Sequence, residues 1–254
     1  METNKLFSLQ GRFSTIQRKA DGSLDNTTKT WLGNVKEASI EMSVDKETMK
    51  ESFSGQRADY GTIITGKTFS LNMTLTEWLP EPLALSLYAK EVKVDAKTIA
   101  DEEFPTVVDG NTVVLDGYFI SDLIIKDSTA TPVTLKEGVD YEIVSDISGD
   151  IKILNTKTFK QPFKASYKSS EATALYPFAN IQPPERCLVF EGINTLTGKN
   201  TYIEMYRVQF DPTSNFGLIN ETFGELPLTG TLLIDSQKTG KDQLSGYMQV
   251  LTME

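Results

Sequence analysis

The sequence predicts a mainly β protein with antiparallel sheets, one short α-helix and a small β insertion. Three observations lead to this class. Apolar and polar residues alternate along many short segments, which is typical of strands with one buried face. Turn signals that contain glycine or aspartate separate these segments. Only one segment has helical spacing, and strands do not alternate with helices as they do in proteins with parallel sheets.

The two clearest strands are residues 37–45 and 68–76. They have equal length, and each has one apolar and one polar face, so we expect an antiparallel pair within one sheet. The apolar side chains should face the core: Ile40, Met42, Val44, Phe69, Leu71, Met73 and Leu75. The polar side chains should share the other face: Glu37, Ser39, Glu41, Ser43, Asp45, Ser70, Asn72, Thr74 and Thr76. A slip of one residue would bury the charges, so the register is well specified.

The segment between these strands, residues 46–66, is expected to be a long loop of mixed charge with three glycines. Loops longer than about 12–15 residues are usually functional or disordered. The segment is therefore either a flexible hairpin tip or an arm that docks on another molecule, and the aromatic residues favour the arm. The candidate contact residues are Lys46, Glu47, Lys50, Glu51, Phe53, Arg57, Asp59 and Tyr60.

The same segment contains GTIITGKT at residues 61–68, which matches the phosphate-binding pattern G-x-x-x-x-G-K-[ST]. That pattern binds phosphate only where a helix follows the loop, because the helix N-terminus supplies part of the anion site. Here an alternating strand follows Thr68, so we interpret the match as coincidence.

The one predicted helix lies within residues 77–91, EWLPEPLALSLYAKE, and is expected to have about three turns. Pro80 and Pro82 suit a first turn, where backbone amides have no intrahelical partner. Leu79, Leu83, Leu87 and Tyr88 form an apolar stripe that should cover one end of the β core.

Short strands with frequent turns fill residues 104–168, which we interpret as an inserted β module. Residues 98–105 and 169–178 are expected to be its linkers. The main domain would then be discontinuous, comprising residues 1–103 and 169–254, and its strands resume after Gln182. Cys187 begins an apolar run and is expected to be a buried thiol.

Composition excludes several functional classes. The chain has no histidine and one cysteine, which removes histidine-based triads and nearly every zinc-water site. Its net charge is −10 and no segment concentrates lysine and arginine, unlike proteins that grip nucleic acid. No apolar run is long enough to span a bilayer, and the N-terminal residues lack a secretory signal. We expect no enzyme activity, no cofactor and no metal, and synthesis in a reducing cytoplasm.

Four stretches of the chain resemble the major tail tube proteins of long-tailed (siphovirus-like) bacteriophages. They are WLGNVKEASIEMSVDKETMKESFSGQRADYG, FSLNMTLTEWLPEPLALSLYA, LKEGVDYEIVSDISGDIKIL and LVFEGINTLTGKNTYIEMYRVQFDPTSNFGLINETFGELPLTGTLLID. The resemblance implies a sandwich of two antiparallel sheets with a flanking helix. It also implies a structural virion protein whose hexameric rings stack into a tube that conducts DNA during ejection.

Under this resemblance, the polar face of residues 37–45 and 70–76 lines the lumen, and the arm of residues 46–66 connects rings. Residues 104–168 would sit on the outer rim. DNA would pass without specific binding, because an acidic wall does not retain a polyanion. The implied partners are other copies of the chain, a tape measure protein, and tail terminator or baseplate proteins. Assembly in the bacterial host cytoplasm would precede incorporation into the virion tail, without membrane insertion.

Three alternatives remain open at this point. The first is a monomeric β-sandwich module that binds carbohydrate or peptide through its loops, with Trp31 and Trp78 as candidate platforms. The second is an enzyme built on GTIITGKT. The third is a related secretion-system tube protein, which would share the fold and differ in its partners.

Overall fold

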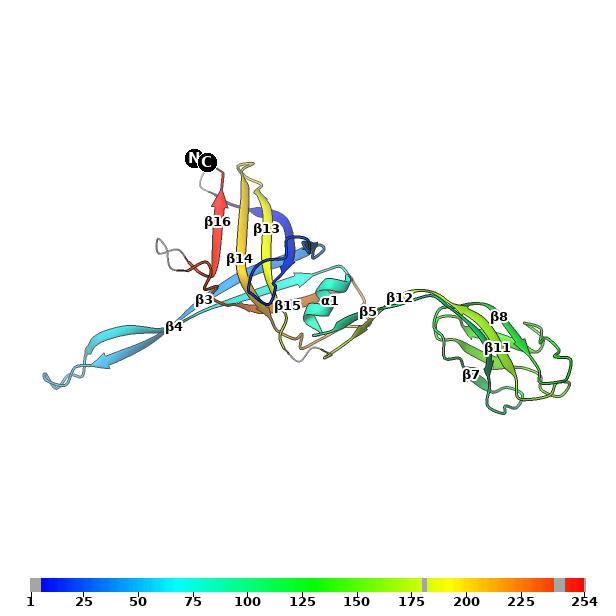
Figure 1. Ribbon diagram of the computed structural model, residues 1–254. Coiled ribbons are helices and arrows are strands. Elements are labelled where there is room, and N and C mark those ends of the chain that lie inside the picture. The colour runs from blue at the N-terminus through cyan, green and yellow to red at the C-terminus, as the bar shows by residue number, and fades with distance from the viewer. Residues whose placement is uncertain (1–5, 180–181, 240–244, 254) are drawn as a thin grey trace. The chain divides into compact units, whose positions relative to one another are not determined.

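A computed structural model describes residues 6–179, 182–239 and 245–253 (Figure 1). The chain is mainly β, with one helix and several antiparallel sheets. It divides into two compact units, of which one comprises Met1–Glu91 with Leu175–Glu254 and the other Val92–Ala174. The division falls within β5 (Lys90–Val94) and β12 (Ala172–Tyr176), which pair as a two-stranded sheet.

The first unit contains an eight-stranded antiparallel sheet in the order β2-β1-β13-β14-β15-β4-β3, in which β16 also pairs with β14. Its strands are β1 (Leu9–Gln17), β2 (Thr30–Trp31), β3 (Val35–Lys50), β4 (Asp59–Leu75), β13 (Glu185–Asn194), β14 (Asn200–Phe210), β15 (Leu226–Leu232) and β16 (Met248–Thr252). The strands expected after Gln182 are confirmed. Strand β14 pairs with β16 through its first half and with β15 through its last residues.

This sheet curves so that its two ends face each other, which is consistent with a sandwich. Strands β1 and β3 lie at or near opposite ends of the hydrogen-bonded order, yet residues of both line one cleft of about 950 Å³. Side chains from the two halves also share one core: Leu71 and Leu75 of β4 pack in the same cluster as Leu188 of β13 and Met205 of β14.

The helix α1 (Pro80–Ser86) covers part of this core through Pro82, Leu83 and Leu85. It has a proline in its first turn, as predicted, but it is shorter than the expected three turns. Tyr88 ends it, because this residue has a left-handed backbone with φ of 51° and its hydroxyl donates a hydrogen bond to the Phe210 carbonyl at 2.8 Å.

The second unit has two three-stranded sheets and a hydrophobic core of its own. The sheets are β7 (Thr112–Val114), β10 (Asp150–Ile153) and β9 (Tyr141–Ser145), and β6 (Lys97–Glu103), β11 (Lys164–Ser169) and β8 (Ile120–Lys126). The strands expected between residues 112 and 169 are present. The segments expected as linkers, however, contain β6 and β12. Strand β6 is short and charged, and its pairing with β11 places it in this unit.

The buried residue Tyr167 joins the strands of this unit to a turn. Its hydroxyl accepts a hydrogen bond from the Gly117 amide at 2.9 Å and donates one to the Glu102 carboxylate at 2.5 Å. Burial and the neighbouring Glu102 raise the pKa of Tyr167, so the hydroxyl stays protonated.

We therefore expect Tyr167→Phe to lower the free energy of unfolding of this unit by about 1–3 kcal/mol, because the Gly117 amide loses its partner. Denaturant melting of the full chain, with hydrogen exchange to assign the lost protection to β8 and β11, measures this. The control is Tyr118→Phe at an exposed position, where the change should stay within about 0.5 kcal/mol. Equal effects of the two substitutions would contradict the assignment.

Candidate functional site: the β3–β4 hairpin

Strands β3 and β4 pair in the register that the alternation predicts. Glu37 lies opposite Thr74, Ser39 opposite Asn72, and Glu41 opposite Ser70. The amide of Asn72 donates to the Glu41 carboxylate at 3.3 Å, which shows that these side chains share one face. The predicted polar set therefore forms one continuous surface, and every member is exposed or half-buried: Glu37, Ser39, Glu41, Ser43, Asp45, Ser70, Asn72, Thr74 and Thr76.

Neighbouring strands extend this polar face. Thr229 and Thr231 of β15 lie opposite Asn72 and Ser70 of β4. The face carries hydroxyls, an amide and carboxylates, and it includes no aromatic side chain among the residues named. Water can hydrate the polar groups of this face along its whole length.

The apolar face of the same hairpin is buried only at one end. Leu71, Met73 and Leu75 are fully buried, whereas Met42 is 72 % exposed and Val44 is 44 % exposed. The expectation that Met42 and Val44 face the core is wrong. The reason is that the hairpin leaves the core beyond Phe69, which still packs against it and against Tyr247, so Met42 and Val44 stay exposed.

Residues 46–66 form a two-stranded extension and not a long loop. The ladder continues to Lys50 opposite Asp59, so only residues 51–58 form the connection. Of the candidate contact residues, Lys46, Glu47 and Lys50 belong to β3, Asp59 and Tyr60 belong to β4, and Glu51, Phe53 and Arg57 lie in the connection. We call this segment, residues 46–66, the arm; in Figure 1 it projects from the rest of the first unit.

Two irregularities in the ladder explain why the arm does not look like a pair of strands in the sequence. The register shifts between Asp45 and Lys46 and again between Met49 and Lys50. At each shift one residue of β4 has no cross-strand partner in β3. These residues are Thr65 and Tyr60. A bulge of this kind inverts the alternation beyond it, so the period of two is interrupted.

The tip of the arm, residues 51–58, is an ordered turn built around a carboxylate. Glu51 is only 7 % exposed, and it accepts hydrogen bonds from the backbone amides of Phe53 at 2.9 Å and Ser54 at 2.8 Å, and from the Ser54 hydroxyl. The Glu51 amide donates to the Ala58 carbonyl at 2.8 Å and closes the turn. The tip is therefore a defined structure, although it has no core beneath it.

The hydrogen bonds from Ser54 and Phe53 lower the pKa of Glu51 from 4.5 to about 2. Because the pKa of Glu51 is lower in the folded turn, its ionised carboxylate stabilises the turn fully above about pH 4.5. This stabilisation is lost as the pH falls toward 2. We expect the amide resonances of Phe53 and Ser54 to titrate with a midpoint near 2. Glu51→Gln should abolish this titration, and Glu47→Gln on the same arm should leave it unchanged. A midpoint near 4.5 would refute the assignment.

Large apolar side chains remain exposed along the arm. Those more than half exposed are Met49, Phe53, Tyr60, Ile63 and Ile64, and Phe53 is 78 % exposed. The rings of Phe53 and Tyr60 meet edge to face with centroids 5.9 Å apart. Such a concentration of exposed apolar surface on a projecting ribbon is typical of a surface that binds another molecule.

The GTIITGKT motif lies inside strand β4. Gly61 pairs with Met49, and Lys67 pairs with Val44, so the backbone is extended where a phosphate-binding loop would have to wrap around its ligand. The strand expected after Thr68 is confirmed, and it continues to Leu75.

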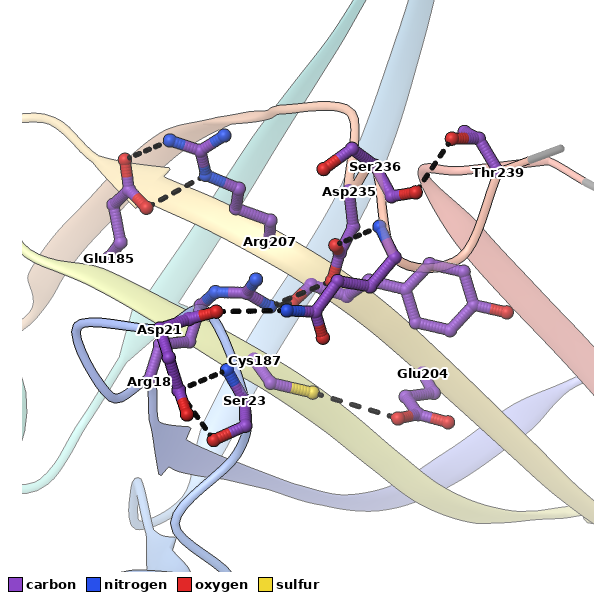
Figure 2. A network of polar contacts seen from close by, with 12 residues as sticks. Arg18, Asp21, Ser23, Glu185, Cys187, Glu204, Arg207, Asp235, Ser236 and Thr239 are labelled. Carbon is purple, nitrogen blue, oxygen red and sulfur yellow. Dashed lines mark hydrogen bonds and ion pairs between the residues drawn. The ribbon is translucent and has the colours of Figure 1, made fainter.

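A second polar cluster lies in the first unit, outside the hairpin (Figure 2). Arg18 donates to the Tyr206 carbonyl at 2.8 Å and to Asp235 at 3.0 Å, with both charged side chains nearly buried. Glu185 and Arg207 form two parallel hydrogen bonds of 2.8 and 2.9 Å. Arg18 and Arg207 each have a carboxylate partner, and the cluster ties together β1, β13, β14 and the segment after β15.

Cys187 lies beside this cluster, fully buried, with its sulfur 3.9 Å from a Glu204 oxygen (Figure 2). Burial and the Glu204 carboxylate raise the pKa of its thiol to about 12. The expected buried thiol is confirmed, and in this environment the sulfur stays protonated and unreactive.

Within residues 6–179, 182–239 and 245–253, no group of three or more His, Cys, Asp or Glu side chains could hold a metal ion, and no helix is long and apolar enough to cross a membrane.

A family model described as "Protein of unknown function UCP028589" matches residues 6–251, so the chain belongs to that family. The match includes the arm and both units. No curated protein matches the chain.

Proposed function

We propose that the protein is a major tail tube protein of a long-tailed bacteriophage, a structural component of the virion tail. In this proposal, hexameric rings of the chain stack into a tube through which DNA is ejected into the host. The observation that carries the proposal is the β3–β4 hairpin, which combines a continuous polar face with an arm of exposed apolar side chains.

The arm supports self-assembly for an energetic reason. A two-stranded ribbon without a core is at best marginally stable in water, and this one exposes several large apolar side chains. Contact with another copy would bury these side chains. A tape measure protein would contact the chain inside the tube. A terminator or baseplate protein would contact it at the ends of the tube.

The polar face supports a conduit. Hydroxyls and carboxylates offer neither an aromatic stacking platform nor a cationic groove, which are the two devices that hold nucleic acid strands. The net charge of −10 disfavours retention of a polyanion in the same way. The second unit, Val92–Ala174, has its own core and would sit on the outer rim, where it leaves the channel open.

Size-exclusion chromatography with light scattering over a wide range of protein concentration tests the proposal. We expect rings and larger assemblies whose proportion rises with concentration. A strict monomer at every concentration would contradict it and would favour a monomeric binding module instead.

A further inference from the structure

A second exposed apolar surface lies on the first unit, beside α1. Residues 216–223 follow β14, and this loop exposes Leu218, Ile219 and Phe223, of which Ile219 is 96 % and Phe223 is 91 % exposed. Trp78 is 68 % exposed and packs against Phe216 with ring centroids 5.1 Å apart. We call Trp78 together with residues 216–223 the loop surface.

The loop surface is hollowed. A depression of about 300 Å³ lies between Trp78, Phe216 and Leu218, with Leu75 and Leu83 of the core at its base. Its volume suits one or two large side chains. A hollow of this kind receives an anchoring aromatic residue in many protein interfaces.

The loop surface and the tip of the arm lie at opposite ends of the same strand. Strand β4 begins at Asp59, beside the tip, and ends at Leu75, three residues before Trp78. Its 17 residues span about 55 Å at roughly 3.3 Å per residue. The tip and the loop surface of one molecule therefore cannot meet, although those of two molecules can.

The two surfaces are complementary in charge and chemistry. The tip presents the aromatic pair Phe53 and Tyr60, and Arg57 has no carboxylate partner within the ranges that the structure describes. On the loop surface, Glu77 lines the hollow and Glu221 is exposed in the loop, and the described residues supply a cation to neither. Glu225 also lines the hollow, but it is paired with Lys36. Aromatic residues and arginine are the side chains most enriched at the energetic centres of interfaces.

We propose that the tip of the arm in one copy docks on the loop surface of a second copy, with Phe53 and Tyr60 against the hollow and Arg57 beside Glu77 and Glu221. This inference rests on the proposed tube, because it names the receptor of the arm between stacked rings. The contact is heterologous, because it joins different surfaces of the two copies. A stack of copies then has a free tip at one end and a free loop surface at the other, so further copies can add without closing the assembly. The length of the hairpin would then set the spacing of the rings.

Engineered cysteines test the contact directly. Gln56→Cys places a thiol on the tip and Thr222→Cys places one on the loop surface; both positions are exposed. On oxidation of assembled protein that carries both substitutions, we expect a ladder of cross-linked multimers on a non-reducing gel, and no ladder for either single variant. The native Cys187 is buried and does not compete. Tubes of the doubly substituted protein that give no ladder would overturn the docking and leave the tube itself standing.

A surface substitution gives an independent measurement. Phe223→Ser should leave the monomer folded, because the ring is almost wholly exposed, and should raise the critical concentration for assembly about tenfold or more. The matched control, Val139→Ser, removes an exposed apolar side chain from the second unit and should have no effect. Equal critical concentrations for Phe223→Ser and wild type would overturn the docking. Wild-type protein that forms no assemblies at all would instead contradict the proposed function and, with it, this contact.

Discussion

Removal of the outer part of the arm, residues 49–61, should leave a folded chain that no longer forms tubes. Thr48 and Thr62 lie directly opposite each other, with hydroxyl oxygens 3.1 Å apart, so residues 49–61 can be replaced by Asn-Gly without a change in register. A two-residue Asn-Gly turn suits the twist of an antiparallel pair. The excised residues contribute nothing to the buried core of the unit, so its stability should change little.

The measurement compares thermal melting with sedimentation of assembled protein. We expect a melting temperature close to that of wild type, together with a complete loss of pelletable tubes. The control is Ser52→Ala at the exposed tip, which keeps the arm and should assemble normally. Normal tubes from the shortened protein would show that the arm is dispensable for assembly.

Charge reversal on the polar face should leave the tube intact and obstruct the passage of DNA. Glu37 and Glu41 are exposed and lie on the same face of β3. Their replacement by lysine, repeated around each ring, would place a band of positive charge in the proposed lumen. Phosphate groups would then be attracted to the wall. The attraction would be strongest at low salt, because charges are screened only weakly there.

We expect Glu37→Lys with Glu41→Lys to slow or block DNA delivery from phage particles at low ionic strength, with partial recovery as salt is raised. The same change of charge at Glu103 and Glu137 of the second unit serves as the control and should leave ejection unchanged. Unchanged ejection kinetics at low salt in the first variant, or a structure of the tube with Glu37 and Glu41 on its outer surface, would refute the lumen assignment.

The fold was predictable where alternation is uninterrupted. The pairing of β3 with β4 follows from two segments of equal length, and the charges of Glu37 and Glu41 permit only one register. Strands β13, β14 and β15 carry enough apolar residues to be recognised individually. Strands β5, β6 and β12 were not predicted. Strands β5 and β6 are short and rich in charge, and β12 has only five residues with mixed exposure, so all three resemble linkers in the sequence.

The arm shows a second limit of sequence reasoning. Its residues were predicted as contacts between molecules, but the bulges at Thr65 and Tyr60 hide its strand structure. Thr62, Ile63 and Ile64 are β-branched and favour extended backbone, and this was the one available signal that the ladder continues.

The loop surface depends entirely on three-dimensional contacts. Residues 216–223 show no periodicity. Trp78 lies near them because Leu75 at the end of β4 pairs with Leu226 at the start of β15, which brings the segments beyond these two strand ends together. The available sign of an exposed surface was the group of four large apolar side chains in FGLINETF, a short segment that also contains glycine and asparagine. Their exposure could not be inferred without the fold, since apolar residues in loops often cover a core.

Electron microscopy of the purified protein in negative stain shows directly whether the chain assembles into tubes. We expect hollow tubes of stacked rings with sixfold end views and, in the arm-shortened protein, isolated rings or monomers in their place. Images that contain only small separate particles at every protein concentration would contradict the claim that this chain builds a tube.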